Sequence, residues 1–333
     1  MKAWLVPDNG EPGEVMRLAD VDEPTPQAGQ VLVRVKAAAL NFPDVLLCRG
    51  EYQFRPPLPF TPGVELCGEI VTTGDGVDDL AIGDRVIGTP ALPAGALAEY
   101  ALMNAADAFP APAVLDDAAA AALHIAYQTG WFGLHRRAQL QAGETLLVHA
   151  AAGGVGSAAI QLGKAAGARV IAVVGGPAKA AVAAGLGADV VVDRHHDDVV
   201  AAVREATGGR GADVVFDPVG GDAFTQSTRC VAFEGRILVV GFAGGTIPAP
   251  QLGHALVKNY SIVGLHWGLY KSRDPASVAA AHEELVTLAG KGVVAPLVSE
   301  RLALADAVGG LTRLAAGDTV GRVVVEHGTR REA

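Results

Sequence analysis

A glycine-rich segment near the middle of the chain constrains the fold more than any other feature. The run Ala151-Ala152-Gly153-Gly154-Val155-Gly156 lies between an apolar stretch, Thr145–His149, and a helical pattern, Gly156–Ala166, which Gly167 ends. A strand, a tight glycine turn and a helix form the first part of a βαβ unit, because the glycines let the helix pack closely against the strand. A parallel sheet is therefore expected from Thr145 onward.

The same alternation continues through the rest of the middle region. Further strands are predicted over Arg169–Val174, Val190–Val192, Asp213–Phe216 and Arg236–Val240, with helices over Pro177–Gly185 and Asp197–Thr207. Continuous Val, Ile and Leu strands are typical of parallel sheets that helices cover on both faces. The expected fold class is therefore α/β, with a doubly wound parallel sheet of the Rossmann type.

The first third of the chain has a different pattern. Short strands are predicted over Val31–Val35, Gly63–Thr72 and Asp84–Gly88. The prolines between Arg55 and Gly63 exclude a helix there. This pattern predicts an irregular, β-rich domain at the start of the chain.

The pattern changes again near Asp116, and this change places a domain boundary. A helix is predicted over Asp116–Ile125. Near the other end, a helix over Ser277–Ala289 and a strand over Gly321–Glu326 are expected to return to the first domain, and the tail from His327 is expected to be disordered. Two domains suit a chain of this length. Residues 1–120 with 271–333 form the expected β-rich catalytic domain, and residues 121–270 form the Rossmann domain.

Composition limits the class of protein and its partners. Of 333 residues, 50% are hydrophobic and 19% charged, a globular balance, and no apolar run is long enough for a membrane span. The amino terminus lacks a signal-peptide pattern, and the cysteines, Cys48, Cys67 and Cys230, lie far apart, so a reducing, cytoplasmic location is expected. The net charge of −10 argues against nucleic acid as a partner.

The glycine turn has a specific chemistry. A backbone without a Cβ at Gly153 can approach a pyrophosphate, and Gly156 lets the helix lie close to the strand. The free amides at the helix start, at Gly154 and Val155, together with the helix dipole, favour phosphate oxygens. Ala151 stands where the dinucleotide-binding pattern usually has its first glycine. A purely structural turn is the alternative, which the flanking strand and helix disfavour.

The end of the second strand of the predicted sheet indicates which dinucleotide is bound. NAD enzymes usually have an acid there that binds the ribose hydroxyls, but Val174 is followed by Gly175-Gly176-Pro177-Ala178-Lys179. Small residues leave room for a 2′-phosphate, and Lys179 and Arg194 can pair with it. The alternative is that both are solvated surface charges. Together with the missing acid, these residues favour NADPH as the cofactor.

Several motifs occur in a fixed order along the chain. They are Asn41-Phe42-Pro43-Asp44, Pro62–Gly68, Gly83-Asp84-Arg85-Val86, Gly143–Gly156, Asp217–Gly221 and Val240-Gly241-Phe242. In this combination the chain resembles the medium-chain dehydrogenase/reductase superfamily, and within it the zinc-free quinone oxidoreductase branch, over almost its whole length. The resemblance implies that the β-rich domain is GroES-like and that the active site lies between the domains.

The resemblance also bears on metal binding. Zinc-dependent relatives have a Cys where Asn41 stands and a His where Val64 stands, and neither an amide nor an isopropyl group can replace those ligands. No cysteine lies between Gly88 and Tyr100, so the structural zinc loop is absent as well. No metal is expected, and without a Lewis acid the oxidation of simple alcohols is disfavoured. Surface or packing roles are expected for His124, His195 and His196.

Four residues are catalytic by resemblance: Asn41, Asp44, Tyr52 and Thr129. Asn41 would donate through its amide and Tyr52 through its phenol, Asp44 would orient either one, and the Thr129 hydroxyl would lie near the nicotinamide. The alternatives are turn or helix-cap roles for Asn41 and Asp44, and a half-buried tyrosine over the proline-rich loop for Tyr52. Leu46 replaces a second tyrosine of some relatives and makes the pocket more apolar. The expected cofactor-binding residues are Phe42, Gly153, Gly154, Val155, Gly156, Gly175, Lys179, Arg194, Gly241, Phe242, Ala243 and His266.

The expected function is hydride transfer from NADPH to a quinone, an acceptor that needs positioning and a hydrogen-bond donor rather than a metal. The alternatives are a zinc-free reductase of enones or enoyl thioesters, and a non-catalytic NADPH-binding protein of the crystallin-like or redox-sensing kind. The expected partners are a small-molecule quinone or enone and a second copy of the chain, with no nucleic acid and no membrane. In the resembling family the apolar segment Tyr260–Leu265 pairs antiparallel with its copy, which implies a homodimer.

Overall fold

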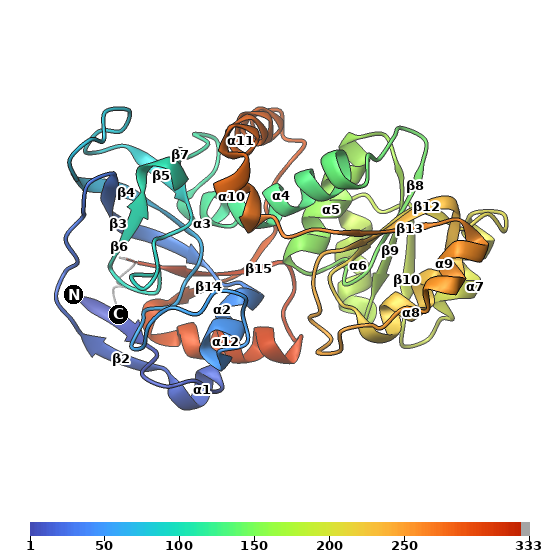
Figure 1. The fold of residues 1–333 in the computed structure, drawn as a ribbon, viewed down its shortest axis with the longest axis horizontal. Helices are drawn as coiled ribbons and strands as arrows, with labels where there is room; N and C mark the ends of the chain where they lie inside the picture. Colours follow the sequence, from blue (N-terminus) through green and yellow to red (C-terminus); the bar gives the residue numbers. More distant parts are fainter. Residues whose placement is uncertain (328–333) are drawn as a thin grey trace. The chain divides into compact units, whose positions relative to one another are not determined.

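The computed structural model describes residues 1–327, and the chain divides into two compact units. The first unit comprises Met1–Ile125 and the chain from Ala295 onward, and the second comprises Ala126–Val294. Figure 1 shows the first unit built mainly of strands and the second built of a sheet between helices. Within this described part, every helix is too short or too polar to span a lipid bilayer.

The second unit is built on a six-stranded sheet in which all neighbouring strands are parallel (Figure 1). Its strands are β8 (Thr145–Val148), β9 (Arg169–Val174), β10 (Val190–Asp193), β11 (Ala212–Asp217), β12 (Val231–Val239) and β13 (Ser261–Gly264), in the order β10-β9-β8-β11-β12-β13. The chain runs outward from β8 to β10 and then in the opposite direction from β11 to β13. The sheet is therefore doubly wound, with its switch point between β8 and β11, which confirms the expected fold class.

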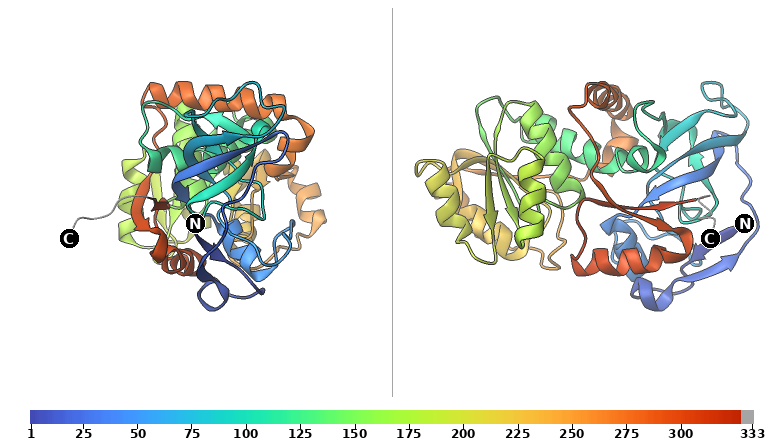
Figure 2. Two further views of the ribbon diagram at one scale, coloured as in Figure 1. Left: turned by 90° about the vertical axis from the view of Figure 1, so that its left-hand side faces the viewer. Right: turned by 180° about the vertical axis from the view of Figure 1, so that it is seen from behind.

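Helices cover both faces of this sheet (Figure 2). The helices of the second unit, not all of which lie on the sheet, are α4 (His124–Trp131), α5 (Gly154–Ala165), α6 (Pro177–Gly185), α7 (Val199–Ala206), α8 (Gly221–Cys230), α9 (Leu252–Lys258), α10 (Gly268–Arg273) and α11 (Pro275–Gly290). A π-helical segment, Phe132–Arg137, follows α4. Leu147, Ile171, Val215 and Ile237, one from each of four strands, are fully buried. Burial on both faces explains why these strands are continuously apolar in the sequence.

The first unit contains a seven-stranded, largely antiparallel sheet and a small two-stranded sheet. Its strands are β1 (Lys2–Leu5), β2 (Arg17–Asp20), β3 (Gln30–Ala39), β4 (Leu66–Thr73), β5 (Arg85–Gly88), β6 (Tyr100–Asn104), β7 (Ala108–Pro110), β14 (Val298–Ala303) and β15 (Arg322–Glu326), and its helices are α1 (Pro12–Val15), α2 (Phe42–Arg49), α3 (Asp117–Ala121) and α12 (Ala307–Ala316). β3 lies at the centre and pairs with β15, β4 and β6. His327, expected to be disordered, donates its backbone N–H to Lys36 O at 2.9 Å; the rest of that tail, 328–333, lies outside the described residues.

The helix expected over Asp116–Ile125 is wrong in its extent. Asp116 does cap α3, because its carboxylate accepts from Ala119 N at 2.8 Å, but α3 ends at Ala121. A separate helix, α4, begins at His124. An alanine-rich run favours helix at every position, so the sequence carries no local signal for the break.

The second boundary between the units lies farther along the chain than expected. The sequence assigned the chain from residue 271 to the first unit, but α11 belongs to the second. Gln128 Nε2 donates to Val278 O and Trp131 Nε1 donates to Glu284 Oε2, both at 2.9 Å. These bonds join α11 to α4, a contact between segments about 150 residues apart in sequence, which a local pattern does not reveal.

β13 forms the outer edge of the parallel sheet, as expected for the segment Tyr260–Leu265. Among the described strands it pairs with β12 alone. Leu265 N donates to Val239 O at 3.0 Å, and N–H groups along a strand alternate between its two sides, so the N–H of Ile262 faces away from β12. An apolar edge with free amides is prone to pair with another strand.

We predict that two copies of the chain pair along β13, because isologous pairing of this kind closes at a dimer. Light scattering at micromolar concentration should give twice the chain mass. Ile262→Pro should give a folded monomer, because proline removes an N–H that β12 does not use. Val263→Pro is the matched variant whose N–H faces β12, and it should lower stability instead. A monomeric wild type, or a dimeric Ile262→Pro variant, would contradict this prediction.

Candidate functional site

The residues expected to bind a cofactor gather at one edge of the parallel sheet. Gly153–Gly156 follow β8, Gly175 and Lys179 follow β9, Arg194 follows β10, Gly241–Ala243 follow β12 and His266 follows β13. Because all these strands are parallel, their carboxyl ends meet at this edge, where doubly wound sheets bind ligands. Phe42 belongs to the other unit, where it is the first residue of α2.

The turn after β8 has the geometry of a phosphate-binding turn. A Cβ on Gly156 would lie 2.3 Å from Ala150 O, and one on Gly153 would lie 3.2 Å from the same atom. Ala150 has a φ of 46°, a left-handed conformation that costs an alanine about 1 kcal/mol. This strained residue directly precedes Ala151, which the sequence placed at the first glycine position. The first turn of α5 carries no acid, so no carboxylate of that turn would compete with an anion for its free amides.

The turns after β9 and β10 lie side by side, because Val174 is paired with Asp193. Arg194 N donates to Val174 O at 3.0 Å, and Arg194 Nε lies 3.1 Å from the point where a Cβ on Gly175 would stand. Sequence analysis missed Asp193, whose Oδ1 accepts from Gly176 N at 2.9 Å. That N–H lowers the pKa of the Asp193 carboxyl, so the residue is ionised at neutral pH and holds the glycine turn.

Asp217 organises the other side of the switch point. It is buried at the end of β11, and its Oδ1 accepts from Gly220 N at 3.0 Å. Ala243 N donates to Pro218 O at 3.0 Å, which joins the loop after β12 to the loop after β11. A Cβ on Gly220 would come within 2.9 Å of the Phe242 ring. Sequence analysis included Asp217 in a motif but gave it no role.

Asp44 holds the start of α2 in the first unit. It is fully buried, and its two oxygens accept from Asn41 N and Gly63 N, each at 2.9 Å. Burial raises the pKa of Asp44 to about 7, against the opposing effect of the backbone N–H donors. The carboxyl group therefore joins the helix start to the turn at Gly63, which is the helix-cap role that the sequence left open.

The Asn41 side chain is hydrogen-bonded at both ends. Its Nδ2 donates to Ala39 O at 3.0 Å and to Glu65 Oε2 at 2.9 Å, and its Oδ1 accepts from Arg322 Nη1 at 2.9 Å. An amide nitrogen has two hydrogens, and both are used inside the unit. This differs from the expected donation to a substrate, because the amide has no hydrogen left for that bond in this arrangement.

Glu65 and Arg322 form a buried ion pair that sequence analysis missed. Their side chains are 0% and 5% exposed, and Arg322 Nη2 donates to Glu65 Oε2. Glu65 Oε1 accepts from Ile125 N at 2.6 Å, at the start of α4. Burial raises the pKa of Glu65, and the neighbouring guanidinium opposes that effect. The one available signal was an arginine opening a strand that continues with three valines.

Tyr52 and Thr129 come from different units. Tyr52 is half-buried beyond the end of α2 and packs against the core of the first unit. Burial, and secondarily the Asp44 carboxylate, raises the pKa of the Tyr52 phenol, which therefore keeps its proton at neutral pH. Thr129 is buried on α4 in the second unit. The Tyr52 hydroxyl, on the first unit, therefore has a proton that it can donate in a hydrogen bond at neutral pH.

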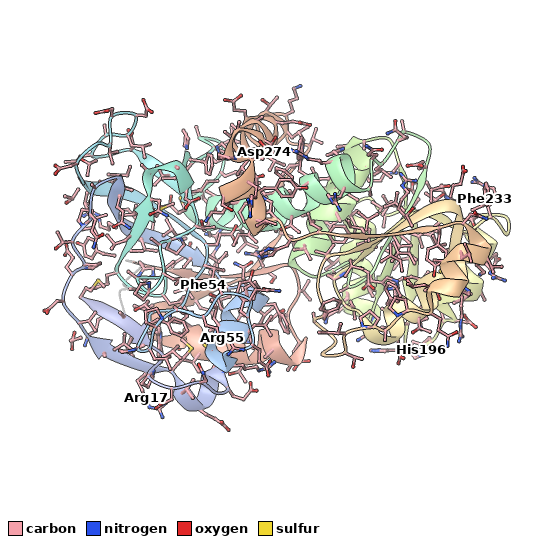
Figure 3. The ribbon with its side chains drawn as sticks, in the orientation of Figure 1. Arg17, Phe54, Arg55, His196, Phe233 and Asp274 are labelled. Carbon is pink, nitrogen blue, oxygen red and sulfur yellow. The ribbon has the colours of Figure 1, made fainter. Side chains whose placement is uncertain are left out.

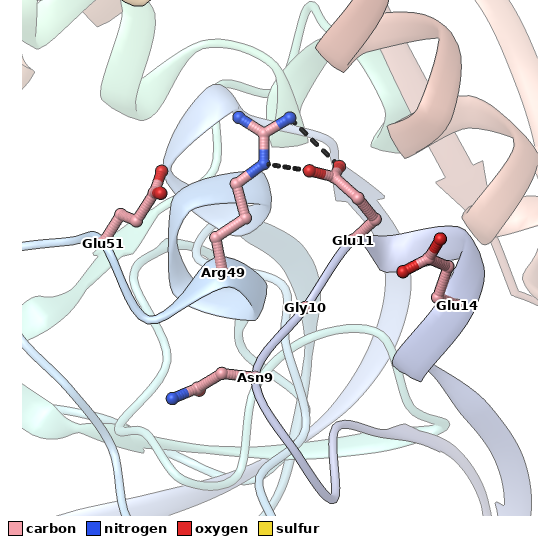
Figure 4. Close-up of a pocket in the computed structure, with 6 residues that line it drawn as sticks. All are labelled: Asn9, Gly10, Glu11, Glu14, Arg49 and Glu51. Atoms are coloured by element: carbon pink, nitrogen blue, oxygen red, sulfur yellow. Dashed lines mark hydrogen bonds and ion pairs between the residues drawn. The ribbon is translucent and has the colours of Figure 1, made fainter.

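A pocket of about 540 Å³ lies beside α1 and α2 (Figure 4). Its lining residues are Asn9, Gly10, Glu11, Glu14, Arg49 and Glu51. Arg49 donates to both oxygens of Glu11, at 2.8 and 3.0 Å, so the one cation of the lining is neutralised within it. None of the residues expected at the catalytic or cofactor site lines this pocket.

Within residues 1–327, no group of three or more His, Cys, Asp and Glu side chains is placed to hold a metal ion. At the two positions where zinc-dependent relatives have ligands, the Asn41 amide is bonded to Glu65 and Arg322, and Val64 packs against the core of the first unit. Catalysis without zinc remains a prediction.

Comparison with known proteins identifies the family. Residues 27–113 match the alcohol dehydrogenase GroES-like domain family, and residues 154–285 match the zinc-binding dehydrogenase family. The quinone oxidoreductase-like protein 2 of Bos taurus is 36% identical over 316 residues, which cover 94% of this chain and 90% of the relative.

Two solved structures are similar over nearly the whole chain. The Escherichia coli quinone oxidoreductase complexed with NADPH has a TM-score of 0.92 at 30% identity, covering 98% of this chain and 100% of that one. The quinone oxidoreductase of Pseudomonas syringae has a TM-score of 0.91 at 33% identity, covering 98% and 99%. The chain therefore belongs to the medium-chain dehydrogenase/reductase superfamily, with the quinone oxidoreductase-like proteins.

We predict that Glu65→Gln strongly destabilises the first unit, because it leaves the Arg322 guanidinium buried without a counter-charge. Removing one partner of a buried ion pair costs about 3–5 kcal/mol. Urea unfolding of the variant measures this loss. Glu69→Gln is the control, since Glu69 forms exposed pairs with Arg34 and Lys36 that are worth at most about 1 kcal/mol. Equal losses in the two variants would show that the buried pair has no special role.

Proposed function

We propose that the protein is an NADPH-dependent oxidoreductase that transfers a hydride to a quinone without a catalytic metal. The observation that supports the cofactor assignment is the arrangement at one edge of the parallel sheet. There the glycine turn after β8 lies next to the turn after β9, which carries Lys179. Similarity to quinone oxidoreductases over nearly the whole chain supports the acceptor assignment.

The residues at this edge fit NADPH. The pyrophosphate would be held by the backbone amides of Gly154, Val155 and Gly156 at the start of α5. Gly156 has no room for a side chain, so the start of the helix can pack closely against the end of β8. The 2′-phosphate would lie at the turn after β9, between Lys179 and Arg194. The remaining residues of the set, Gly175, Gly241–Ala243 and His266 at the strand ends and Phe42 on α2, would complete the binding site.

The bound dinucleotide supplies the hydride, and the residues of the chain provide position and a proton. Tyr52 is the proposed donor to the acceptor oxygen, because its phenol keeps its proton at neutral pH. Thr129 is proposed to orient the nicotinamide through its hydroxyl. Asn41 and Asp44 are assigned to positioning, since their polar atoms are already bonded within the first unit. None of these four roles requires a metal ion.

We predict that quinones oxidise the bound cofactor faster than enones or enoyl thioesters do. Stopped-flow mixing of the NADPH-loaded protein with a panel of the three acceptor classes measures each rate directly. Tyr52→Phe should lower the rate with quinones while the Kd for NADPH stays the same, because the lost hydroxyl acts on the acceptor. A faster reaction with enoyl thioesters would replace the quinone assignment and keep the cofactor. The absence of oxidation by every acceptor would instead support a binding protein.

We also predict that activity survives the removal of metal ions. The positions at which relatives bind catalytic zinc carry Asn41 and Val64, which offer no thiolate or imidazole. Dialysis against 1,10-phenanthroline should leave kcat unchanged, and elemental analysis should find less than one zinc per chain. Loss of activity that zinc restores would overturn the prediction.

A further inference from the structure

Two side chains from the turn after β10 approach the turn after β9, and the function proposed above uses only one of them. A Cβ on Gly175 would lie 3.1 Å from Arg194 Nε, 3.1 Å from His195 Cε1 and 3.2 Å from His195 Nε2. The three atoms nearest to that point thus all belong to Arg194 and His195. A glycine at position 175 lets the guanidinium and the imidazole approach the backbone together.

Asp193 lies beside the imidazole and holds the backbone of His195. Its Oδ1 accepts from His195 N at 3.1 Å and from Gly176 N at 2.9 Å, and it lies 4.0 Å from His195 Nδ1. The carboxylate thus lies on the Nδ1 side of the ring, and Cε1 and Nε2 lie on the Gly175 side. Of the two ring nitrogens, Nε2 is therefore the one that a ligand at this turn would meet.

Hydrogen-bond donors and two cationic side chains gather around Gly175. Arg194 and His195 approach from the β10 side, and Lys179 lies in the first turn of α6. That helix has Gly176 as its N-cap and no acid in its first turn, so its free amides add to the positive potential. The acids that face this group are bonded to backbone N–H groups: Asp193 as described, and Asp197 through Asp193 N at 2.8 Å.

We propose that His195 contacts the 2′-phosphate of NADPH through Nε2, beside the Arg194 guanidinium, and thereby sets the preference for NADPH over NADH. This assignment rests on the proposed cofactor. A hydrogen bond to a phosphate is charge-assisted and strong, and NADH offers no phosphate at this position. His196, which is also exposed (Figure 3), donates its backbone N–H to Asp193 O at 2.9 Å, and its side chain is not among the three atoms nearest to the Gly175 Cβ position.

The test is a fluorescence titration of the wild type and its variants with NADPH and NADH, repeated by competition with 2′,5′-ADP and 5′-AMP. His195→Gln should raise the Kd for NADPH and 2′,5′-ADP about tenfold, the loss expected for one charge-assisted contact, with less than a twofold change for NADH and 5′-AMP. His196→Gln, the matched control, should leave all four Kd values within about twofold. These readouts measure binding and do not depend on turnover.

Two further variants test the geometry. Gly175→Ala should weaken NADPH more than NADH, because its Cβ would displace both the Arg194 and the His195 side chains. His195→Arg should keep the preference for NADPH, because it retains a hydrogen-bond donor at the turn. Both positions are in the second unit and outside the packed core, so these variants are expected to fold.

The outcomes separate this assignment from the cofactor proposal. If the wild type binds NADH as tightly as NADPH, the cofactor proposal and the role of His195 both fail. If the wild type prefers NADPH and His195→Gln keeps the whole preference, only the role of His195 fails. That role also fails if His195→Gln weakens NADPH and NADH equally, or if His196→Gln has the same effect as His195→Gln.

Discussion

The candidate cofactor site depends on one constraint, the parallel register of the six strands in the second unit. Val148 is level with Ala172 and with Phe216, and Val174 is level with Asp193, so the turns that follow these strands stand next to one another. A shift of one residue would move every side chain of a strand to the opposite face of the sheet, and helices pack against both faces. Such a shift would therefore disrupt the contacts between the strand and the helices on both sides. The packing of apolar side chains therefore fixes the position of every turn at the carboxyl edge.

The first unit shows how strongly buried charge limits what a polar residue can do. Glu65 and Arg322 are removed from water, so each needs the other, and Asn41 bridges them with its amide. A loss of activity after substitution of Asn41 would therefore not identify a catalytic group, because the same substitution breaks the network that holds the start of α4. Tyr52 is a clearer subject for such an experiment, since its hydroxyl takes no part in that network.

The sequence predicted the parts of the fold that local pattern determines. β9 and α6 begin and end where periodicity and turn residues placed them, and the outer position of the Tyr260–Leu265 segment was correct. The errors have a common cause in contacts between distant segments. Glu65 and Arg322 are 257 residues apart, and α11 is held to α4 by hydrogen bonds that span about 150 residues. Neither relation leaves a periodic trace in the sequence.

The turn after β9 also shows why the preference for NADH or NADPH cannot be predicted from a single residue. The sequence rule looks for an acid directly after β9 and finds glycine, but the neighbouring strand places an acid, Asp193, at the same level. What matters is what that carboxylate is bonded to. An acid that selects NADH accepts from the ribose hydroxyls. Asp193 instead uses its Oδ1 to accept from two backbone N–H groups of the turns themselves. The acid that would oppose a phosphate at the end of β9 is thus the one that holds the glycine turn and the backbone of His195.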